Sequence, residues 1–441
     1  MAASTQHDIH TFNDNGAWCW FQDERAIIDP ETNTLLIGSV AAAEGPGGEQ
    51  RSGNIELAVT DLASGSTEIV VLHERLEADD HNDPALWIRP DGRYLAMYTK
   101  HKSDNFQRWR ISTRPHDAGE WGPEQVFDWT ELTDGRGATY SNLHYLADEG
   151  RLYAFVRAIN DDPSILISDD HGDTFRYGGK LFTRPKLGYV NGYTRYASNG
   201  DAPDGAGRID LITTDHHPRN YDNSIYHGYI SGGSLHRSDG AVVDESVLDP
   251  EAPSQVELTT LLASGSTLDD SPLTHAWTTD IRQGRAGQSG QIAAVLTARA
   301  NDEPENSNFS DHRFVYARFD GAAWQVFPLA KAGANLLPHE EDYTGLASID
   351  PYDLDSLYLS APIDPRDGSA LTRHEIFHGR TSDGGASWEW SPITEHSTED
   401  NLRPIVVPGD PDTLAVTWFR GTMTASQHYD CRVVGIVSQR S

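Results

Sequence analysis

One pattern recurs along the whole chain: two apolar strands joined by a short turn of proline, acidic residues or glycine. Turn residues of this kind between apolar runs predict β-hairpins. Their starts are separated by roughly 50 to 80 residues, and no segment has a helical period. The hairpins span residues 26–40, 84–98, 142–156, 194–213, 276–297, 345–359 and 404–418. We therefore predict an all-β, seven-bladed β-propeller with four-stranded antiparallel blades, formed as a single domain by residues 1–441.

Two outer turns carry a second repeat signal. Residues 168–175 and 381–388 match the Asp-box pattern, Ser or Thr, then Asp, Gly, Ser or Thr, and an aromatic residue at fixed spacing. In such a turn the Asp side chain accepts hydrogen bonds from turn amides, while the aromatic side chain packs between strands. We assign these boxes a structural role. The segment at residues 10–12 is expected to complete the last blade, which closes the ring and removes free sheet edges.

The charge balance restricts the class of ligand. Lys and Arg number 34 against 67 Asp and Glu, so the net charge is −33. This excludes non-specific nucleic-acid binding as a default role. Because the overall field repels anions at low salt, an acidic substrate needs a local cluster of Arg and His.

Other compositional features predict location and assembly. No apolar run approaches the ~20 residues that cross a bilayer, so we expect no membrane interaction. The N-terminus has no basic stretch and no apolar core, so no signal peptide is visible. We therefore expect a cytoplasmic location by default, or secretion if the chain is a mature form. Two cysteines, Cys19 and Cys431, make no disulfide framework, and we expect buried free thiols unless the chain ends bring them together. We expect a monomer.

Two histidines flank one hairpin and give the best indication of function. His81 precedes its first strand, and His101 follows its second strand. The start and the end of an antiparallel hairpin lie side by side, so both imidazoles should emerge on the same rim. Neighbouring imidazoles suit proton transfer near neutral pH.

Polar side chains occupy the matching positions of other hairpins. In a propeller, the loops that enter the first strands and leave the second strands converge on one funnel at the central channel. The further candidates for this funnel are Asn82, Tyr140, Asn142, Arg157, Tyr193, Arg195, Arg219, Tyr343 and Arg403. His216 and His217 could form half of a metal site, but no Cys or carboxylate partner stands at ligand spacing. We expect Asp215 to fix a turn.

This set suits β-elimination at a uronic acid. The hydrogen on C5 becomes acidic only when the adjacent carboxylate is neutralised, which an arginine can do. A His or Tyr can then abstract the proton, and another can protonate the oxygen that leaves C4. The candidate neutralisers are Arg157, Arg195 and Arg219, and the candidate proton carriers are His81, His101 and Tyr140.

Several blocks of the sequence resemble the propeller family that contains ulvan lyases and rhamnosyl-glucuronate lyases. They are residues 18–26, 81–86 with 101, 139–142, 157, 214–220, 223–226 and 401–404. The resemblance implies a seven-bladed propeller that cleaves the bond between L-rhamnose and C4 of glucuronate, leaving a 4,5-unsaturated uronate. It also implies that the family's histidine pair falls on His81 and His101, and its tyrosine on Tyr140. The carboxylate-neutralising arginines would then be among Arg157, Arg195 and Arg219.

The resemblance leaves the length of the substrate open. Few lysines, the negative charge and the lack of a visible secretion signal favour release of a capping rhamnose, as in gum arabic or arabinogalactan side chains. Endo-acting cleavage of ulvan is the alternative. No cofactor is needed for the chemistry. Members of the family often hold a structural metal, Ca or Zn, which this sequence does not place.

Hydrolysis and simple binding remain as other interpretations. A sister hydrolase family with this fold removes the same rhamnose with a histidine on the opposite face, near the first blade. This chain has no His between His10 and His73, which favours the lyase. A sialidase-like hydrolase would need a Tyr–Glu pair, and no convincing pair stands out. A non-catalytic carbohydrate-binding propeller is the last alternative.

Overall fold

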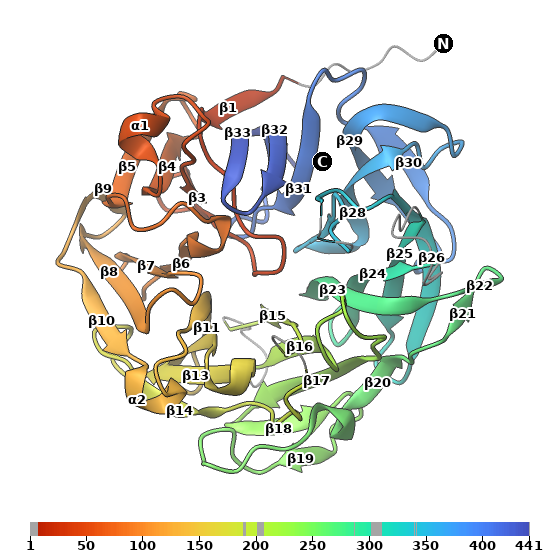
Figure 1. Ribbon diagram of the computed structural model, residues 1–441, viewed down its shortest axis with the longest axis horizontal. Helices are drawn as coiled ribbons and strands as arrows, with labels where there is room; N and C mark the ends of the chain where they lie inside the picture. The colour runs from red at the N-terminus through yellow and green to blue at the C-terminus, as the bar shows by residue number, and fades with distance from the viewer. Residues whose placement is uncertain are drawn as a thin grey trace.

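Seven antiparallel blades surround a central axis in the computed structural model, which describes residues 8–187, 191–200, 207–285, 287–300, 311–338, 340 and 342–440 (Figure 1). The predicted seven-bladed all-β propeller is confirmed. The first strand of each blade lies nearest the axis, and the later strands follow toward the outside.

The first four blades occupy the first six-tenths of the chain. Blade 1 contains β2 (Ala26–Asp29), β3 (Thr34–Val40), β4 (Ile55–Asp61) and β5 (Thr67–His73). Blade 2 contains β6 (Ala85–Ile88), β7 (Tyr94–Thr99), β8 (Phe106–Arg114) and β10 (Gln125–Asp128), with β9 (Asp117–Trp121) paired to β8. Blade 3 contains β11 (Thr139–Leu146), β12 (Arg151–Arg157), β13 (Pro163–Ser168) and β14 (Arg176–Lys180). Blade 4 contains β15 (Thr194–Ser198), β16 (Ile209–Thr214), β17 (Ile225–Ser231), β18 (Ser234–Arg237) and β19 (Val242–Asp244), with β20 (Thr259–Leu262) paired to β17.

The remaining blades complete the ring. Blade 5 contains β23 (Thr274–Gln283), β24 (Ile292–Arg299), β25 (His312–Phe319) and β26 (Trp324–Gly333), preceded by the small hairpin of β21 (Thr267–Leu268) and β22 (Ser271–Pro272). Blade 6 contains β27 (Ala347–Asp350), β28 (Asp353–Ile363), β29 (Ala370–Arg380) and β30 (Glu389–Pro392). Blade 7 contains β31 (Asp400–Val406), β32 (Thr413–Ala425), β33 (His428–Gln439) and β1 (His10–Asn13). Short helical turns lie in connections: α1 (Gly48–Arg51), α2 (Thr130–Thr133), η1 (Asp80–Asn82), η2 (Ile159–Asp161) and η3 (Gln255–Glu257).

Each predicted hairpin forms the two innermost strands of a blade. The turn between β6 and β7 shows why its sequence specifies a hairpin. Arg89 and Arg93 close it through a backbone hydrogen bond of 2.8 Å, and Asp91 accepts a hydrogen bond from the Arg93 amide at 3.1 Å. Gly92 has φ +78°, and a Cβ there would lie 2.4 Å from the His116 ring. Glycine is therefore required both for the backbone conformation and for the space.

The N-terminal strand closes the ring as predicted. β1 pairs with β33, with His10 opposite Gly435, so blade 7 joins both ends of the chain. Cys19 and Cys431 are both buried and free, which confirms the expectation of unpaired thiols. Closing the ring pairs strands that would otherwise present open edges.

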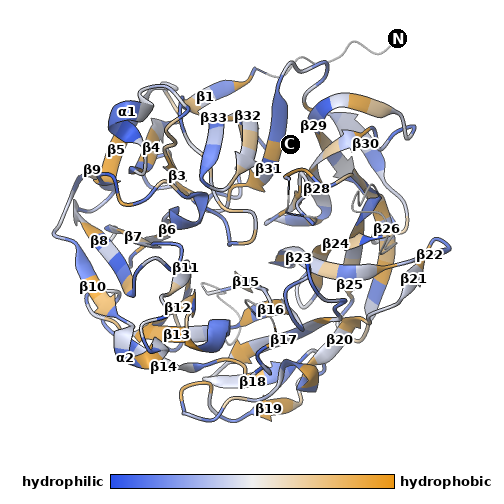
Figure 2. Cartoon of the chain, viewed as in Figure 1, coloured by the Kyte–Doolittle hydropathy of each residue, from blue (hydrophilic) through white to orange (hydrophobic). Residues whose placement is uncertain are grey.

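The hydrophobic core is distributed between neighbouring blades (Figure 2). Between blades 2 and 3, for example, Leu95 and Met97 of β7 are fully buried and share a cluster with Leu152 and Ala154 of β12. Burial of one such leucine contributes about 1.5–3 kcal/mol relative to exposure. Rigid packing between blades holds the loops at the central channel in fixed positions.

The Asp boxes have the predicted structural role. The carboxylate of Asp170 accepts hydrogen bonds from the Thr174 amide at 2.9 Å and hydroxyl at 2.6 Å, and Asp383 does the same for Ser387. The aromatic residue of the second box, Trp388, packs edge-on against Tyr316 with ring centroids 5.1 Å apart. Helices long and apolar enough for a membrane crossing are absent from the described part of the chain.

Candidate active site

The two predicted histidines lie against each other at the ends of the innermost hairpin of blade 2. His81 belongs to η1, before β6, and His101 follows β7. Their rings are stacked, with centroids 3.8 Å apart and planes 8° from parallel. The His81 side chain is 6% exposed, whereas that of His101 is 29% exposed. The hairpin between them therefore brings both imidazoles to one rim, as its antiparallel geometry requires.

Asp79 holds both rings through the same carboxylate. Its side chain caps η1 by accepting a hydrogen bond from the His81 amide. Its two oxygens lie 2.8 Å from His81 Nδ1 and 3.0 Å from His101 Nδ1. His101 thus donates its Nδ1–H to Asp79, while the Nδ1–H of His81 lies between Asp79 and an Asp80 oxygen at 2.7 Å, and both rings turn Nε2 away from Asp79.

Electrostatics separate the two histidines into different protonation states. Burial and the charge of His81 together lower the pKa of His101 to about 4, against the opposing effect of Asp79, so His101 is neutral at neutral pH. Burial also disfavours charge on His81, but the acidic groups around it outweigh this effect. Cys19, Asp79 and Asp80 together raise the pKa of His81 well above its ordinary value of 6.5. A neutral imidazole with a lone pair on Nε2 therefore stacks on an imidazolium.

Tyr140 and Arg157 form the adjoining wall on blade 3. A register irregularity between Thr139 and Asn142 on β11 accompanies a left-handed φ of 72° at Tyr140. The Tyr140 ring lies 5.7 Å from that of His81, and its hydroxyl is buried with no hydrogen-bond partner among the described residues. Burial raises the pKa of Tyr140 well above 10, so the phenol keeps its proton.

The guanidinium of Arg157 lies over two aromatic rings. Its central carbon is 4.6 Å from the Tyr140 centroid and 5.1 Å from the Tyr193 centroid. Arg157 is 6% exposed, yet Nε and Nη1 lack hydrogen-bond partners within the described part of the chain. A buried donor without an acceptor is costly, so these two N–H groups are suited to a ligand anion.

Blade 4 adds Tyr193, His217 and Arg219. The Tyr193 hydroxyl and His217 Nε2 are 3.2 Å apart, while His217 Nδ1 accepts the Arg219 backbone amide at 3.2 Å. Burial, together with the charge of Arg219, lowers the pKa of His217 to about 3. A neutral His217 that accepts at Nδ1 carries its proton on Nε2 and donates it to the Tyr193 oxygen. The Arg219 guanidinium pairs with Glu340 at 2.8 Å.

A buried aromatic group packs next to Tyr193. Tyr343 packs edge-on against Phe21, with centroids 5.2 Å apart, and Phe21 stacks on Trp277 at 3.6 Å. Tyr193 also contacts this group, 4.7 Å from Trp277. Sequence reasoning missed Trp277 and Phe21. The aromatic run at residues 18–21 was the available signal for Phe21.

Arg195 and Arg403 lie deeper than the histidines, in an ion network of the channel. Both are fully buried. Arg195 pairs with Glu24 at 3.0 Å and with Asp280 at 3.3 Å, so carboxylates of blades 1 and 5 compensate its positive charge. Arg403 donates a hydrogen bond to the Gln22 carbonyl at 2.8 Å. Among the described residues, the ion pairs and hydrogen bonds of both arginines are with other parts of the protein, and none of them joins Arg195 or Arg403 to the side chain of His81 or His101.

Asn82 and Asn142 also make contacts within the protein. The Asn82 amide donates to the Glu77 side chain at 3.1 Å, and Glu77 accepts the His101 backbone amide at the same distance. Asn142 accepts the Asp23 amide at 3.1 Å. Both asparagines are buried, and both fix loops that carry site residues.

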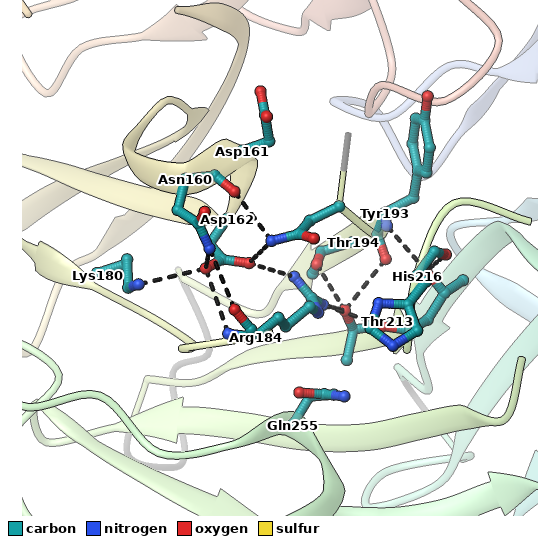
Figure 3. A network of polar contacts seen from close by, with 12 residues as sticks. Asn160, Asp161, Asp162, Lys180, Arg184, Tyr193, Thr194, Thr213, His216 and Gln255 are labelled. Carbon is teal, nitrogen blue, oxygen red and sulfur yellow. Dashed lines mark hydrogen bonds and ion pairs between the residues drawn. The ribbon is translucent and has the colours of Figure 1, made fainter. Parts of the chain in front are cut away.

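A second network anchors the blade 3–blade 4 side of the funnel (Figure 3). Asp162 is its centre: the buried carboxylate accepts hydrogen bonds from Lys180 at 3.2 Å and Asn191 at 3.0 Å, and it faces Arg184. Arg184 also donates to the Thr214 carbonyl at 3.1 Å, which ties this network to the strand before His216. Asp215 accepts the Ser224 amide at 2.9 Å, as expected for a residue that fixes a turn.

Among the described residues, two groups of side chains have donor atoms close enough to hold a metal ion. They are Cys19, Asp80 and His81, and Asp79, His81 and His101. Both include His81, whose Nδ1 already lies within hydrogen-bond distance of Asp79. Neither group contains His216 or His217, the pair weighed from the sequence.

Comparisons with known proteins agree on the architecture. The profile of the BNR repeat-containing family matches residues 48–332. An ulvan lyase structure described as a new family of polysaccharide lyase, bound to -[GlcA(1-4)Rha3S]-, has a TM-score of 0.66 and 13% identity, covering 98% of this chain and 97% of that one. The polysaccharide lyase Uly1 has a TM-score of 0.56 and 11% identity, covering 99% and 94%. The comparison with curated proteins found no match. At these identities the structural likeness shows the fold alone.

Proposed function

Because the chain belongs to the BNR repeat-containing family and its propeller presents this funnel, we propose that it is a polysaccharide lyase that acts on glucuronate by β-elimination. The bond that we assign is the one between L-rhamnose and C4 of D-glucuronate. The products are then a rhamnose, either free or at the end of the released saccharide, and a 4,5-unsaturated uronate.

One observation carries the proposal: the buried guanidinium of Arg157 has two N–H groups without partners in the described residues, beside the stacked histidines. A uronate carboxylate has two oxygens that match a guanidinium fork. Binding there neutralises the carboxylate and supplies the missing acceptors. It also lowers the energy of the enolate-like intermediate, because the negative charge moves onto the same oxygens.

The protonation states assign the proton transfers. Neutral His101, with its lone pair on Nε2, takes the proton from C5. The electrons of the C5–H bond form the C4–C5 double bond as the bond from C4 to the leaving oxygen breaks. Tyr140 gives its proton to that oxygen, and the imidazolium of His81 adds fixed positive charge next to Arg157.

Support for the bond comes from the ulvan lyase neighbour, whose structure holds a saccharide of glucuronate and sulfated rhamnose. The net charge of −33 favours a short substrate with a capping rhamnose over a long polyanion. Internal cleavage of ulvan is the second candidate, because the same structural neighbour is an ulvan lyase. We expect a monomer that needs no cofactor for the chemistry.

The test is incubation with a rhamnosyl-glucuronate oligosaccharide while ultraviolet absorbance of the unsaturated uronate is recorded. A rise in absorbance with release of rhamnose supports the proposal. Free rhamnose without absorbance indicates a hydrolase, and neither product indicates a binding protein. With polymeric ulvan, the size of the early products separates removal of end groups from internal cleavage.

A further inference from the structure

A groove lies between blades 5 and 6, at their outermost strands β26 and β30 on the circumference of the ring (Figure 1). Its volume is about 490 Å³, which falls in the range of pockets that bind small ligands. The lining residues are Pro328, Leu329, Pro365, Arg366 and residues 386–390. The stacked histidines lie at the innermost hairpin of blade 2, so this groove is separate from the candidate active site.

Two tryptophans of the lining are held by the protein and remain partly exposed. Trp388 and Trp390 have ring centroids 5.8 Å apart, with planes 27° from parallel. Trp388 donates its indole N–H to the Gly385 carbonyl at 3.1 Å. Trp390 lies opposite Gly379 on β29, where a Cβ would come within 2.5 Å of its ring. Both rings are half-buried, so they form a fixed aromatic surface inside the groove.

The Asp box accounts for only one of these rings. Trp388 is the aromatic residue of the box, whereas Trp390 lies two residues further on, outside the pattern. In the first box the same position is occupied by Tyr177, whose ring meets Trp129 of blade 2 edge-on at 6.0 Å. Among the described residues, Trp390 has no aromatic contact with the neighbouring blade, and its only ring contact is with Trp388. Its partly exposed face is therefore available to a ligand.

Two polar groups at the groove have unused hydrogen-bonding capacity. Trp390 Nε1 has no hydrogen-bond partner within the described part of the chain, and it is not one of the buried unsatisfied atoms. The exposed carboxylate of Glu389 makes no hydrogen bond or ion pair with any described residue. The hydroxyls of a sugar both accept and donate, so they match an indole N–H and a carboxylate together. The C–H groups on the face of a sugar ring can pack on the indole at the same time.

The charges of the groove favour a neutral ligand. Arg366 is the one cation among the described lining residues, and it pairs with Asp364 at 2.7 Å and with Glu395 at 3.2 Å. Together with Glu389, three carboxylates thus accompany one guanidinium. An anionic sugar is disfavoured by these carboxylates and by the net charge of −33. A ligand cation would instead lie beside the guanidinium of Arg366, which repels it.

The groove lacks the wide apolar surface that a protein partner would cover. The most exposed large hydrophobic side chains of the described residues lie elsewhere, among them Ile69 and Val71 on β5 and Val242 on β19. A stable protein interface buries about 800 Å² on each partner around an apolar centre. Two half-buried indoles with a polar rim match a single small ring better than such an interface.

We propose that this groove is a second saccharide-binding site, which holds a neutral sugar ring against Trp390. The ring packs on the indole, one hydroxyl accepts the Trp390 N–H, and another donates to Glu389. The inference goes beyond the proposed function, because the groove takes no part in cleavage. When the bound sugar belongs to a branched polysaccharide, other branches of the same molecule stay at high local concentration near the enzyme.

The experiment measures binding of an arabinogalactan from which the acidic caps have been removed, so that no glucuronate can occupy the candidate active site. Native affinity electrophoresis and calorimetric titration give the affinity. We expect wild-type protein to bind, and Trp390→Ala to weaken binding by about 10-fold or more. Glu389→Ala should weaken it by about 3- to 10-fold, and it should not disturb folding, because its exposed side chain has no partner among the described residues.

Trp121→Ala is the matched control. Trp121 is also a half-buried tryptophan on an outer strand, β9 of blade 2, and its N–H already donates to the Ala118 carbonyl at 2.8 Å. This variant should bind like wild type. No binding by wild type, unchanged affinity in both groove variants, or stronger Trp390-dependent binding of polygalacturonate than of the neutral polymer would overturn the proposal. Cleavage of a rhamnosyl-glucuronate disaccharide is measured separately and should be unchanged in Trp390→Ala, so the groove and the lyase proposal can fail independently.

Discussion

Replacing Arg157 by methionine should separate catalysis from stability. The substitution removes two buried N–H groups that have no acceptor among the described residues. Methionine keeps a long, flexible chain against Tyr140 and Tyr193, so most of the packing is retained. The folded protein loses two unsatisfied N–H groups together with the cation–π contacts to Tyr140 and Tyr193, and because these effects oppose each other, we expect a small change in the free energy of unfolding.

The loss of activity can be estimated from the same two groups. A hydrogen bond to a charged group contributes about 1.5–3 kcal/mol net, so two of them contribute about 3–6 kcal/mol. The ratio kcat/KM is referred to free enzyme and free substrate, so the whole of this contribution counts. Because each 1.36 kcal/mol corresponds to a factor of ten, we expect kcat/KM to fall by about 10²–10⁴-fold. The measurements are uronate absorbance for activity, and thermal and urea unfolding for stability.

Arg195→Met is the contrasting variant. Arg195 is equally buried, but it pairs with Glu24 and Asp280. Its removal leaves those carboxylates with fewer partners, so we expect destabilisation of about 3–5 kcal/mol. Near-normal kcat/KM in Arg157→Met would refute the role of Arg157 as the neutraliser. A loss of stability in Arg157→Met as large as that in Arg195→Met would show that Arg157 is structural.

The remaining predictions concern the proton carriers and the metal. His101→Ala and His81→Ala should each lower turnover by ~10² or more, and normal rates in both would remove the pair from the chemistry. The base His101 must be neutral, so kcat/KM should fall as the pH drops through about 4 and should fall again only above neutral pH, where His81 loses its proton. Asp79→Asn removes a negative charge that raises the His81 pKa. In this variant the fall of kcat/KM on the alkaline side should therefore move to lower pH while the protein stays folded. Dialysis against a chelator should leave kcat/KM unchanged, and restoration of a lost rate by Zn²⁺ or Ca²⁺ would contradict a metal-free mechanism.

The fold was predictable because its signals are local. A turn such as Pro90-Asp91-Gly92 specifies its hairpin through its own backbone and side chains, without any contact with other blades. Seven such units at similar spacing then predict seven blades arranged in a ring, as in a β-propeller. The extra strands β9, β19 and β20 were not predicted, because they pair at outer edges where short polar strands have no distinct pattern.

The sequence predicted which residues come together in the site, but not how deeply each one is buried or which charges it pairs with. The ends of the hairpin place His81 and His101 together, and that required only antiparallel pairing. No local sequence pattern shows that Asp79 accepts hydrogen bonds from both rings, because Asp79 and His101 are 22 residues apart in the chain. Arg195 likewise stands at the start of an inner strand, but its depth depends on Glu24 and Asp280 from distant blades.

The arrangement of charge explains how a strongly acidic protein can handle an acidic sugar. A carboxylate lies behind the reactive histidines: the two oxygens of Asp79 accept hydrogen bonds from His81 and His101. This carboxylate orients one imidazolium and one neutral imidazole, and their stacked rings stay side by side. Arg157 has no carboxylate on Nε or Nη1 among the described residues, so these two N–H groups are available to an anion. In the proposed reaction they hold the glucuronate carboxylate where its ring hydrogen meets the neutral imidazole of His101.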